Sequence, residues 1–392
     1  MVVAAFVAFA AFGAFWGVWG ASVPRVQHQA GVSDGELGFA LLFVGAGALP
    51  AMLLAGRALD RWGLRVAAVV IGALGVAGVA LALTAVNLPR LCVGLAVVGA
   101  TSGAADVAEN AVAGRAERLA GRPVITRAHG VFSSLVVLGS IGTGLASPAP
   151  LWAPFLAVAV LSVVAGVCLV ATLPANATGA GATGDRGAAA EPTGARRPGM
   201  VPFLLVGVLG ALAFASENAH QSWSAVFAHD ELRSGLGLSA VAPAVFAGTV
   251  AITRFAVGGL AAGRARTVLL AGAAAAAAGA ALIAAAPTLA VAAIGLAAAA
   301  AGTAVLFPTL VGVVSRNVDE SHRGRATSVV TTVSYLGFLV GPVYVGLWAD
   351  AVGLRGAMVA VAALAIGLFV LTPPLLRLSG LHDRSPRQTV HT

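Results

Sequence analysis

Charged side chains are scarce in this 392-residue chain: Asp, Glu, Lys and Arg make up only 10% of it, and lysine is absent altogether. Hydrophobic residues make up 59%, and the mean hydropathy is +0.95. A water-soluble chain with this composition would expose apolar surface on every side. The scarcity of charge therefore excludes a soluble globular protein and indicates a membrane protein.

Sequence signals of catalysis and metal binding are missing as well. The two cysteines, Cys92 and Cys168, lie inside apolar runs without a CxxC spacing, which argues against a disulfide or a metal site. No Walker loop, nucleophile elbow or array of metal ligands occurs, which excludes ATP-driven transport and the common hydrolases. We expect no enzyme activity, no cofactor and no metal.

Long apolar runs fill most of the chain. A helix that crosses ~30 Å of hydrocarbon needs roughly 20 apolar residues, and barrel strands would alternate in polarity, whereas 66–86 is apolar on every face. The runs therefore predict membrane-spanning helices, and Ser33 with Glu36 fits a capping box that opens the second one. The twelve predicted spans are 2–22, 36–56, 66–86, 90–113, 128–147, 151–173, 201–223, 240–262, 268–286, 289–315, 326–349 and 355–376.

The spans divide into two sets of six. A polar, Gly-rich segment at 175–199 separates 1–174 from 200–376, and its composition suits a flexible cytoplasmic linker. We expect 377–392 to be a cytoplasmic tail. The predicted fold is an all-α membrane protein of twelve transmembrane helices in two pseudo-symmetric six-helix bundles, with the halves related by an axis along the membrane normal.

Arginine placement predicts the orientation. Eighteen of the 23 arginines fall on one side of the predicted spans and four on the other, while Arg254 lies inside the eighth span. By the positive-inside rule both termini are cytoplasmic. This topology also explains the net charge of +8, so nucleic-acid binding is a poor explanation of that charge.

A short motif with the spacing G-x-x-x-D-R-x-G-x-R separates the second and third spans, and it consists of Gly56, Asp60, Arg61, Gly63 and Arg65. This motif resembles the loop between helices two and three of the major facilitator superfamily of secondary transporters. The resemblance implies a conformational latch that stabilises the outward-facing state. An ordinary solvated turn is the alternative.

The resemblance extends along nearly the whole chain in smaller motifs. After the eighth span lies a worn copy of the first motif, without an acid at the position of Asp60: Arg254, Gly258, Gly259, Gly263, Arg264 and Arg266. Other short matches resemble the bacterial YbjJ-type branch, which is similar to fucose:proton symporters: Trp19 with Pro24, Gly35-Glu36-Leu37-Gly38, Asp106-Val107-Ala108 with Asn110, His129-Gly130 with Phe132-Ser133, Glu217 with Trp223-Ser224, and Tyr335-Leu336-Gly337-Phe338 with Gly341-Pro342. This chain departs from that branch at Ser22, Glu109 and His220.

Ionisable residues inside spans are the main functional signal, because a charge at membrane depth is costly unless it faces a cavity or a partner. Asp106, Glu109 and Asn110 occupy positions i, i+3 and i+4 of the fourth span and so share a helix face. Two acids this close cannot both ionise easily in a partly desolvated cavity. We expect Asp106 to carry proton coupling with Glu109 as its partner, and a helix-packing hydrogen-bond network is the alternative.

The seventh span holds a second polar cluster, with Glu217, His220 and Gln221 at i, i+3 and i+4. Glu217 and His220 offer a competing proton-coupling site. A metal site would need a second Glu-x-x-His copy, which the sequence lacks, and a polar cap at the outer interface is the blander alternative. The predicted substrate-binding residues are Asn110, His129, Asn218, Gln221, Trp223 and Tyr335.

These observations predict a secondary active transporter of the bacterial cytoplasmic membrane, most simply a proton-coupled uptake system for a small polar solute such as a sugar or organic acid. A Gly-x-x-x-Gly-Pro motif typical of the fifth span of drug antiporters occurs here in the eleventh span, at 337–342. A proton-driven exporter of drugs or secondary metabolites is the alternative, followed by a membrane sensor that does not transport. The expected partners are protons, a small-molecule substrate and the lipid bilayer, with the chain as a monomer.

Overall fold

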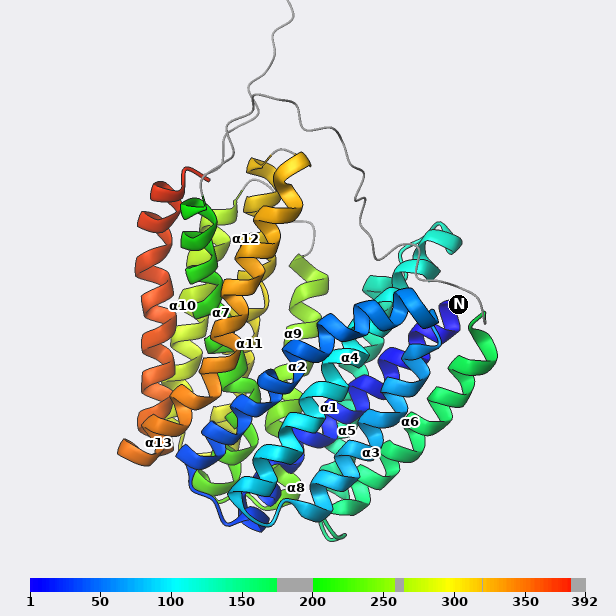
Figure 1. The fold of residues 1–392 in the computed structure, drawn as a ribbon. Helices are drawn as coiled ribbons and strands as arrows, with labels where there is room; N and C mark the ends of the chain where they lie inside the picture. The colour runs from blue at the N-terminus through cyan, green and yellow to red at the C-terminus, as the bar shows by residue number, and fades with distance from the viewer. Residues whose placement is uncertain (175–199, 258–263, 319, 382–392) are drawn as a thin grey trace, which may run out of the picture. The chain divides into compact units, whose positions relative to one another are not determined.

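The computed structural model describes residues 1–174, 200–257, 264–318 and 320–381 (Figure 1). Every regular element within these ranges is a helix, and the described residues contain no strand. The predicted linker at 175–199, the glycines 258, 259 and 263 of the second motif and the end of the predicted tail lie outside the described residues. The all-helical fold predicted from the apolar runs is confirmed.

The helices follow the predicted spans closely. Those of the first half are α1 (Val2–Ala30), α2 (Asp34–Trp62), α3 (Val66–Thr84), α4 (Leu88–Ala120), α5 (Ile125–Leu145) and α6 (Trp152–Thr172). Those of the second half are α7 (Val201–Val226) with a π-helical continuation (Phe227–Glu231), α8 (Leu236–Ser239), α9 (Val241–Val257), α10 (Ala265–Ala285), α11 (Leu289–Ala304), α12 (Leu306–Asn317) and α13 (Glu320–Ser379).

Eleven helical segments of the described chain are long and apolar enough to cross a membrane. The last of them, His322–Ser379, has 58 residues and contains Gly353 with φ 80° and ψ 167°, a non-helical conformation that glycine adopts without strain. Divided at Gly353, this segment supplies the eleventh and twelfth predicted spans. The tenth span is likewise interrupted, because α11 ends and α12 begins around Val305.

Local signals set several helix ends. The Ser33 hydroxyl accepts from the Glu36 backbone N–H at 3.2 Å, and the Ser33 N–H donates to Glu36 Oε2 at 2.9 Å, so the predicted capping box is confirmed. The first helix runs past the predicted end at residue 22 and continues through Pro24 to Ala30. Arg25 consequently lies within this helix, where its Nη2 donates to the carbonyl oxygen of Ala149 at 2.6 Å.

The helices form two compact units. Unit 1 comprises Met1–Ala195 and Ser224–Gly248, and unit 2 comprises Arg196–Trp223 and Thr249–Thr392. In unit 1, α2 packs on α4, α1 on α5 and α3 on α6. Gly99 and Gly103 of α4 let the backbone of α2 approach at Val44 and Ala48, so the small-residue face next to the α4 acids serves helix packing.

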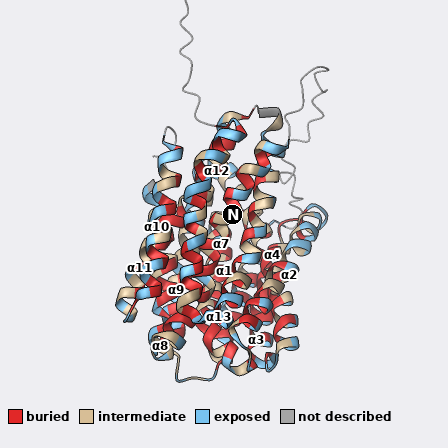
Figure 2. Cartoon of the chain, turned by 90° about the vertical axis from the view of Figure 1, so that its left-hand side faces the viewer, coloured by how far each residue is buried: buried red, intermediate tan, exposed pale blue. Residues whose placement is uncertain are grey.

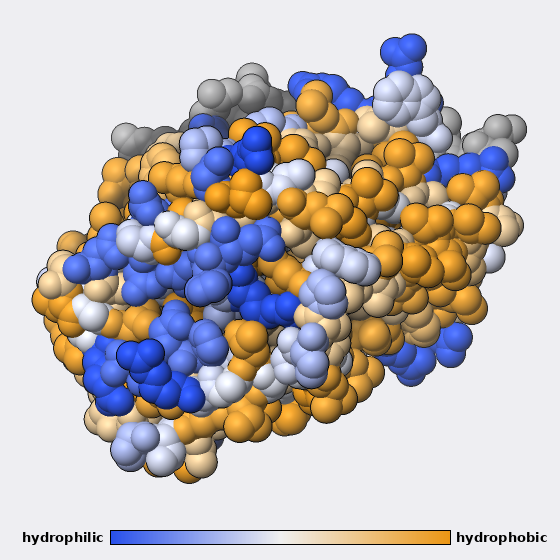
Figure 3. Space-filling model, turned by 90° about the horizontal axis from the view of Figure 1, so that it is seen from below, coloured by the Kyte–Doolittle hydropathy of each residue, from blue (hydrophilic) through white to orange (hydrophobic). Residues whose placement is uncertain are grey.

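Unit 2 has its own hydrophobic core, built around α10 and its contacts with α11 and α13. Leu209, Leu269, Leu310 and Val330 are among the fully buried side chains at its centre. In both units many large apolar side chains remain exposed, including Val69, Leu83, Val167, Ile252 and Val359. Burial therefore follows helix faces rather than hydrophobicity (Figure 2), and apolar side chains cover much of the surface (Figure 3), as expected of helices that face lipid.

Candidate functional site

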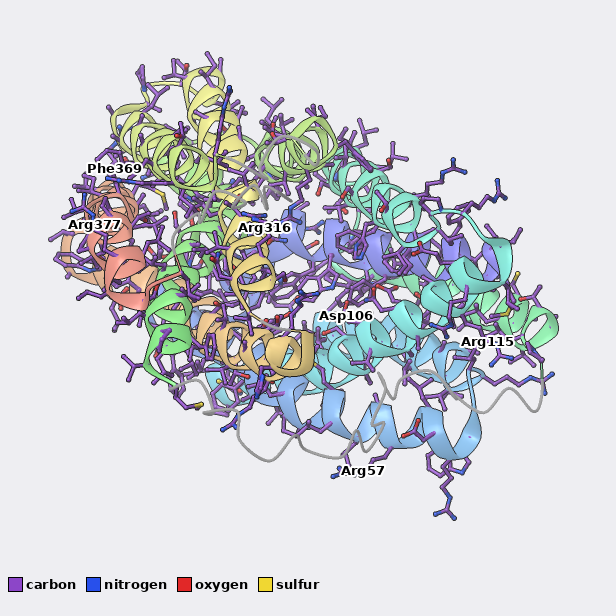
Figure 4. The ribbon with its side chains drawn as sticks, turned by 90° about the horizontal axis from the view of Figure 1, so that it is seen from above. Arg57, Asp106, Arg115, Arg316, Phe369 and Arg377 are labelled. Carbon is purple, nitrogen blue, oxygen red and sulfur yellow. The ribbon has the colours of Figure 1, made fainter. Side chains whose placement is uncertain are left out.

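Helix α4 positions the first acidic cluster, in unit 1. Asp106 is half-buried, and Figure 4 labels it on this helix. The side-chain amide of Asn110 donates to Asp106 Oδ1 at 3.2 Å and to the Asp106 carbonyl oxygen at 2.9 Å. One helical turn separates the two residues, so they face each other along the helix. Asn110 thus orients the Asp106 carboxylate.

Glu109, on the same helix, is only 1% exposed. Its Oε2 atom is buried and has no hydrogen-bond partner among the described residues. No arginine of the described chain forms an ion pair with Asp106 or Glu109 within 4.0 Å. The cluster therefore consists of two neighbouring carboxyl groups without a cation, an arrangement able to bind and release a proton.

Helix α7 positions the second acidic cluster, in unit 2, and here the acid has a cation. Arg254 Nη2 of α9 lies 2.9 Å from Glu217 Oε1 of α7, with side-chain exposures of 48% and 15% respectively. The sequence pattern did not predict this pair. A signal existed, since Arg254 is the one arginine away from the ends of a predicted span, and such a charge needs a partner.

Two prolines leave backbone carbonyl groups without their helical N–H donors, and side chains from other helices donate to these carbonyls instead. Pro308 has no N–H to donate to Ala304, four residues earlier, and Arg254 Nε donates to that carbonyl over a long 3.4 Å. Pro342 likewise frees the carbonyl of Phe338, which accepts from the Asn218 amide at 2.6 Å. These contacts tie α7 and α9 to the interrupted helices of unit 2.

The other residues of α7 with a predicted role in coupling or substrate binding differ in burial and in contacts. His220 is buried, and its Nδ1 lies 2.7 Å from the Ser216 carbonyl oxygen, so the ring donates there. Trp223 is fully buried, and its Nε1 donates to the Pro342 carbonyl oxygen at 3.2 Å. Gln221 is exposed. Asn218 and Trp223 thus already contact α13, and their predicted role in substrate binding stays a prediction.

Four half-buried aromatic rings gather next to this cluster. The ring centroid of Phe214 lies 4.3 Å from that of Phe307 in a stacked arrangement, 5.6 Å from that of Tyr335 and 6.3 Å from that of Phe338. Only Tyr335 among them was predicted from the sequence to bind substrate. The rings come from α7, α12 and α13, so helical periodicity could have grouped only Tyr335 with Phe338.

His129 lies near the start of α5 in unit 1. Its side chain is exposed, and its ring meets Phe9 of α1 edge-on, with centroids 4.9 Å apart. The structure thus records an aromatic contact with the first helix. Its predicted substrate contact remains a prediction.

The motif between α2 and α3 forms a tight turn. Gly63, with φ 73° and ψ −173°, ends α2, and Arg65 Nε donates to the Leu173 carbonyl oxygen at the end of α6 over 3.2 Å. The Arg61 guanidinium carbon lies 5.7 Å from the Trp62 ring centroid. Asp60 is exposed and has no hydrogen-bond or ion-pair partner in the described chain, and a Cβ at Gly56 would meet open space. Arg65 therefore fixes the turn, while Asp60 is available to other partners.

Within the described ranges, no group of three or more His, Cys, Asp and Glu side chains is arranged to hold a metal ion.

Comparison with known proteins points to one family. The family model described as Major Facilitator Superfamily matches residues 4–301 and 262–390. An uncharacterized MFS-type transporter of Yersinia pestis is 29% identical over 353 residues, covering 88% of each chain. An uncharacterized transporter of Sinorhizobium fredii, y4wD, is 29% identical over 358 residues, covering 90% of this chain and 92% of its own.

Solved structures agree on the fold. The nucleoside transporter NupG superposes with a TM-score of 0.73 at 13% identity over 96% of this chain and 99% of its own. The inward-open xylose transporter XylE from E. coli superposes with a TM-score of 0.73 at 13% identity, over 99% of this chain and 97% of its own. A bacterial homolog of the human lysosomal transporter Spinster, in an inward-facing and occupied conformation, superposes with a TM-score of 0.73 at 16% identity over 98% of each chain.

Proposed function

The chain belongs to the major facilitator superfamily, and we propose that it takes up a small polar solute together with protons by alternating access. Members of this family and the structural neighbours are multi-pass membrane transporters, not enzymes. In this proposal 1–174 and 200–376 act as the two moving bundles, joined by 175–199, and Asp60 belongs to the latch that controls their equilibrium. A sugar or organic acid is the expected solute class.

Glu109 is the observation that carries the proposal. Burial of an isolated carboxylate costs several kcal/mol in practice, and Glu109 is 1% exposed with Asp106 three residues away and no cation paired with either in the described chain. The neutral acid is the form suited to that surrounding. Exposure of the pair to water on one side of the membrane then releases the proton, and return to the buried state requires its uptake.

The contrast with Glu217 supports the choice of α4 over α7. Glu217 faces Arg254 at 2.9 Å, and the guanidinium stabilises the ionised carboxylate. Such an acid does not need a proton in order to be buried. Asp106 and Glu109 are therefore the coupling residues in this proposal, with Glu217 and His220 as the competing site.

The arginine distribution and the structural neighbours support the proposed location and solute class. The arginine bias supports a bacterial cytoplasmic membrane with both termini inside, and we propose a monomer. The neighbours named as nucleoside and xylose transporters carry polar solutes, which supports a polar solute here.

The test is accumulation by purified protein in proteoliposomes under an imposed pH gradient, after a screen of radiolabelled sugars, nucleosides and organic acids. Asp106→Asn and Glu109→Gln should abolish accumulation of the solute found, yet allow exchange across the membrane. Glu36→Gln is the matched control, because glutamine keeps the capping box. If both α4 variants still concentrate the solute while Glu217→Gln does not, the coupling site lies in α7 and the proposal is wrong.

A further inference from the structure

Arg254 uses only part of its hydrogen-bonding capacity. A guanidinium has five N–H donors in a planar fork, and a carboxylate can occupy two of them in parallel. Here Glu217 is engaged through Oε1 alone, and Nε donates to Ala304. Arg254 Nη1 donates to none of the described residues, and the side chain is 48% exposed. One edge of the fork is thus held in place while the other is open.

The Ala304 carbonyl fixes the direction of that fork. Because Pro308 cannot donate to it, this carbonyl stays without its helical partner and accepts from Arg254 Nε at 3.4 Å. Glu217 contacts the guanidinium from α7 at 2.9 Å. Two contacts from two helices therefore orient the cation in the empty site. The Ala304 contact still orients it after a ligand has displaced Glu217, which lowers the entropy lost on binding.

Two rings of the four-ring cluster come from positions three residues away from the groups that Arg254 contacts. Phe214 precedes Glu217 by three residues on α7, which is about 5 Å along that helix. Phe307 follows Ala304 by three residues, across the break between α11 and α12. The stacked contact of 4.3 Å between these two rings agrees with that register. Phe338 also lies near Glu217 along α7, since its carbonyl accepts from Asn218, the residue after Glu217.

From these contacts we infer that unit 2 binds a small monocarboxylate with a flat ring. The Arg254 fork takes the carboxylate, the cluster of Phe214, Phe307, Tyr335 and Phe338 takes the ring, and Glu217 is the counter-ion that the ligand displaces. The inference rests on the proposed function, since it names the class of solute that the transporter carries.

The charge balance selects this class. Arg254 is permanently charged and can only donate, so the group it binds is an anion or a hydrogen-bond acceptor. With Glu217 as its partner the empty site is neutral, and one incoming carboxylate keeps it neutral when the displaced Glu217, 15% exposed, takes up a proton from solvent. A neutral sugar would have to leave the ion pair intact, and a dianionic phosphate would bring one charge more than Arg254 balances.

The experiment is equilibrium binding of benzoate to the purified full-length chain in detergent, by titration calorimetry. Benzamide, which has the same ring without the charge, and cyclohexanecarboxylate, which has the charge without the flat ring, are the comparison ligands. We expect benzoate to bind at least roughly tenfold more tightly than either, as loss of a charge-assisted contact implies. Equal binding of benzamide, or no binding of benzoate, overturns the inference.

Variants separate the site from a non-specific effect. Arg254→Gln should abolish benzoate binding, whereas Arg266→Gln, an exposed arginine in the first turn of α10, should not change it. Glu217→Gln removes the competing carboxylate but keeps Arg254, so benzoate should bind several-fold more tightly. That variant keeps the test decisive if Arg254→Gln does not fold. Unchanged or weaker binding to Glu217→Gln contradicts the displacement.

Failure of this inference is distinguishable from failure of the proposed function. Binding in detergent needs no pH gradient and does not involve Asp106 or Glu109. A chain that binds no benzoate but concentrates another solute through the α4 acids keeps its proposed function and loses only the solute class. A chain that binds benzoate at Arg254 and accumulates solute in both α4 variants keeps this site and loses the coupling mechanism.

Discussion

The carboxylates of α4 and α7 form a natural comparison, because both lie in apolar helices at positions with a polar residue one turn away. Glu109 is nearly fully buried and has no cation in the described chain, whereas Glu217 is 15% exposed and meets Arg254. A buried acid can be stabilised by a proton or by a fixed positive charge, and the two choices have different consequences. The first makes the group responsive to protons; the second makes it responsive to whatever competes for the cation.

The largest effect on stability is expected when the α7 pair is broken. Arg254→Gln leaves Glu217 without its cation and should destabilise the protein by about 1–3 kcal/mol, below the range for fully buried pairs because Arg254 is half exposed. Thermal unfolding in detergent measures this loss. The double variant Glu217→Gln/Arg254→Gln should recover part of it, and a double variant as unstable as the single one would contradict the pairing.

Replacement of the buried acid of α4 should change stability little but abolish accumulation. Glu109→Gln orphans no partner, so its unfolding free energy should stay within about 0.5 kcal/mol of the wild type or rise. Gradient-driven accumulation in vesicles should nevertheless be lost. A variant that is strongly destabilised, or one that accumulates solute normally, would remove the contrast between the two clusters.

Asn218 tests whether the carbonyl contacts of unit 2 matter to stability. Asn218→Ala leaves the Phe338 carbonyl without a donor, because Pro342 has none to offer, and should cost about 1–2 kcal/mol. Gln221→Ala, on the exposed face of the same helix, is the control and should change the unfolding midpoint little. Equal shifts for both variants would show that the amide contact contributes nothing specific.

An equally small effect on stability is expected at Asp60, which is exposed and without a partner in the described chain. Asp60→Asn should leave the unfolding free energy within about 0.5 kcal/mol and ligand affinity nearly intact. Transport should slow, and the accessibility of cysteines introduced at the two membrane faces should change. A large loss of affinity with normal cycling would show that Asp60 binds substrate instead.

Much of the fold could be predicted because hydropathy is a local property. Each apolar run coincides with helix in the described chain, although α1, α2 and α4 extend six to eight residues past their predicted ends. The capping box at Ser33 needed only Glu36 nearby. The errors arose where the helix continues past a local signal, as α1 does through Pro24, since neighbouring residues satisfy the backbone around a proline.

The site was only partly predictable, because its contacts are tertiary. The i, i+4 relation of Asp106 and Asn110 follows from helix geometry and was found in advance. The partner of Glu217 lies 37 residues away, and the donor for the Phe338 carbonyl lies 120 residues away. A rule that every arginine in a span needs an acid would have indicated the pair of Arg254 and Glu217. Sequence spacing does not predict that Asn218 donates to the Phe338 carbonyl.

The prolines of unit 2 also bear on motion. In a continuous helix a bend on one side stretches backbone hydrogen bonds of the helix itself, but at Pro342 the bond that would resist bending is supplied by a side chain of α7. Opening α13 there costs one side-chain hydrogen bond, about 0.5–1.5 kcal/mol, which is comparable to the thermal energy. This helix can therefore flex at a fixed point, on the microsecond-to-millisecond timescale of collective helix movements.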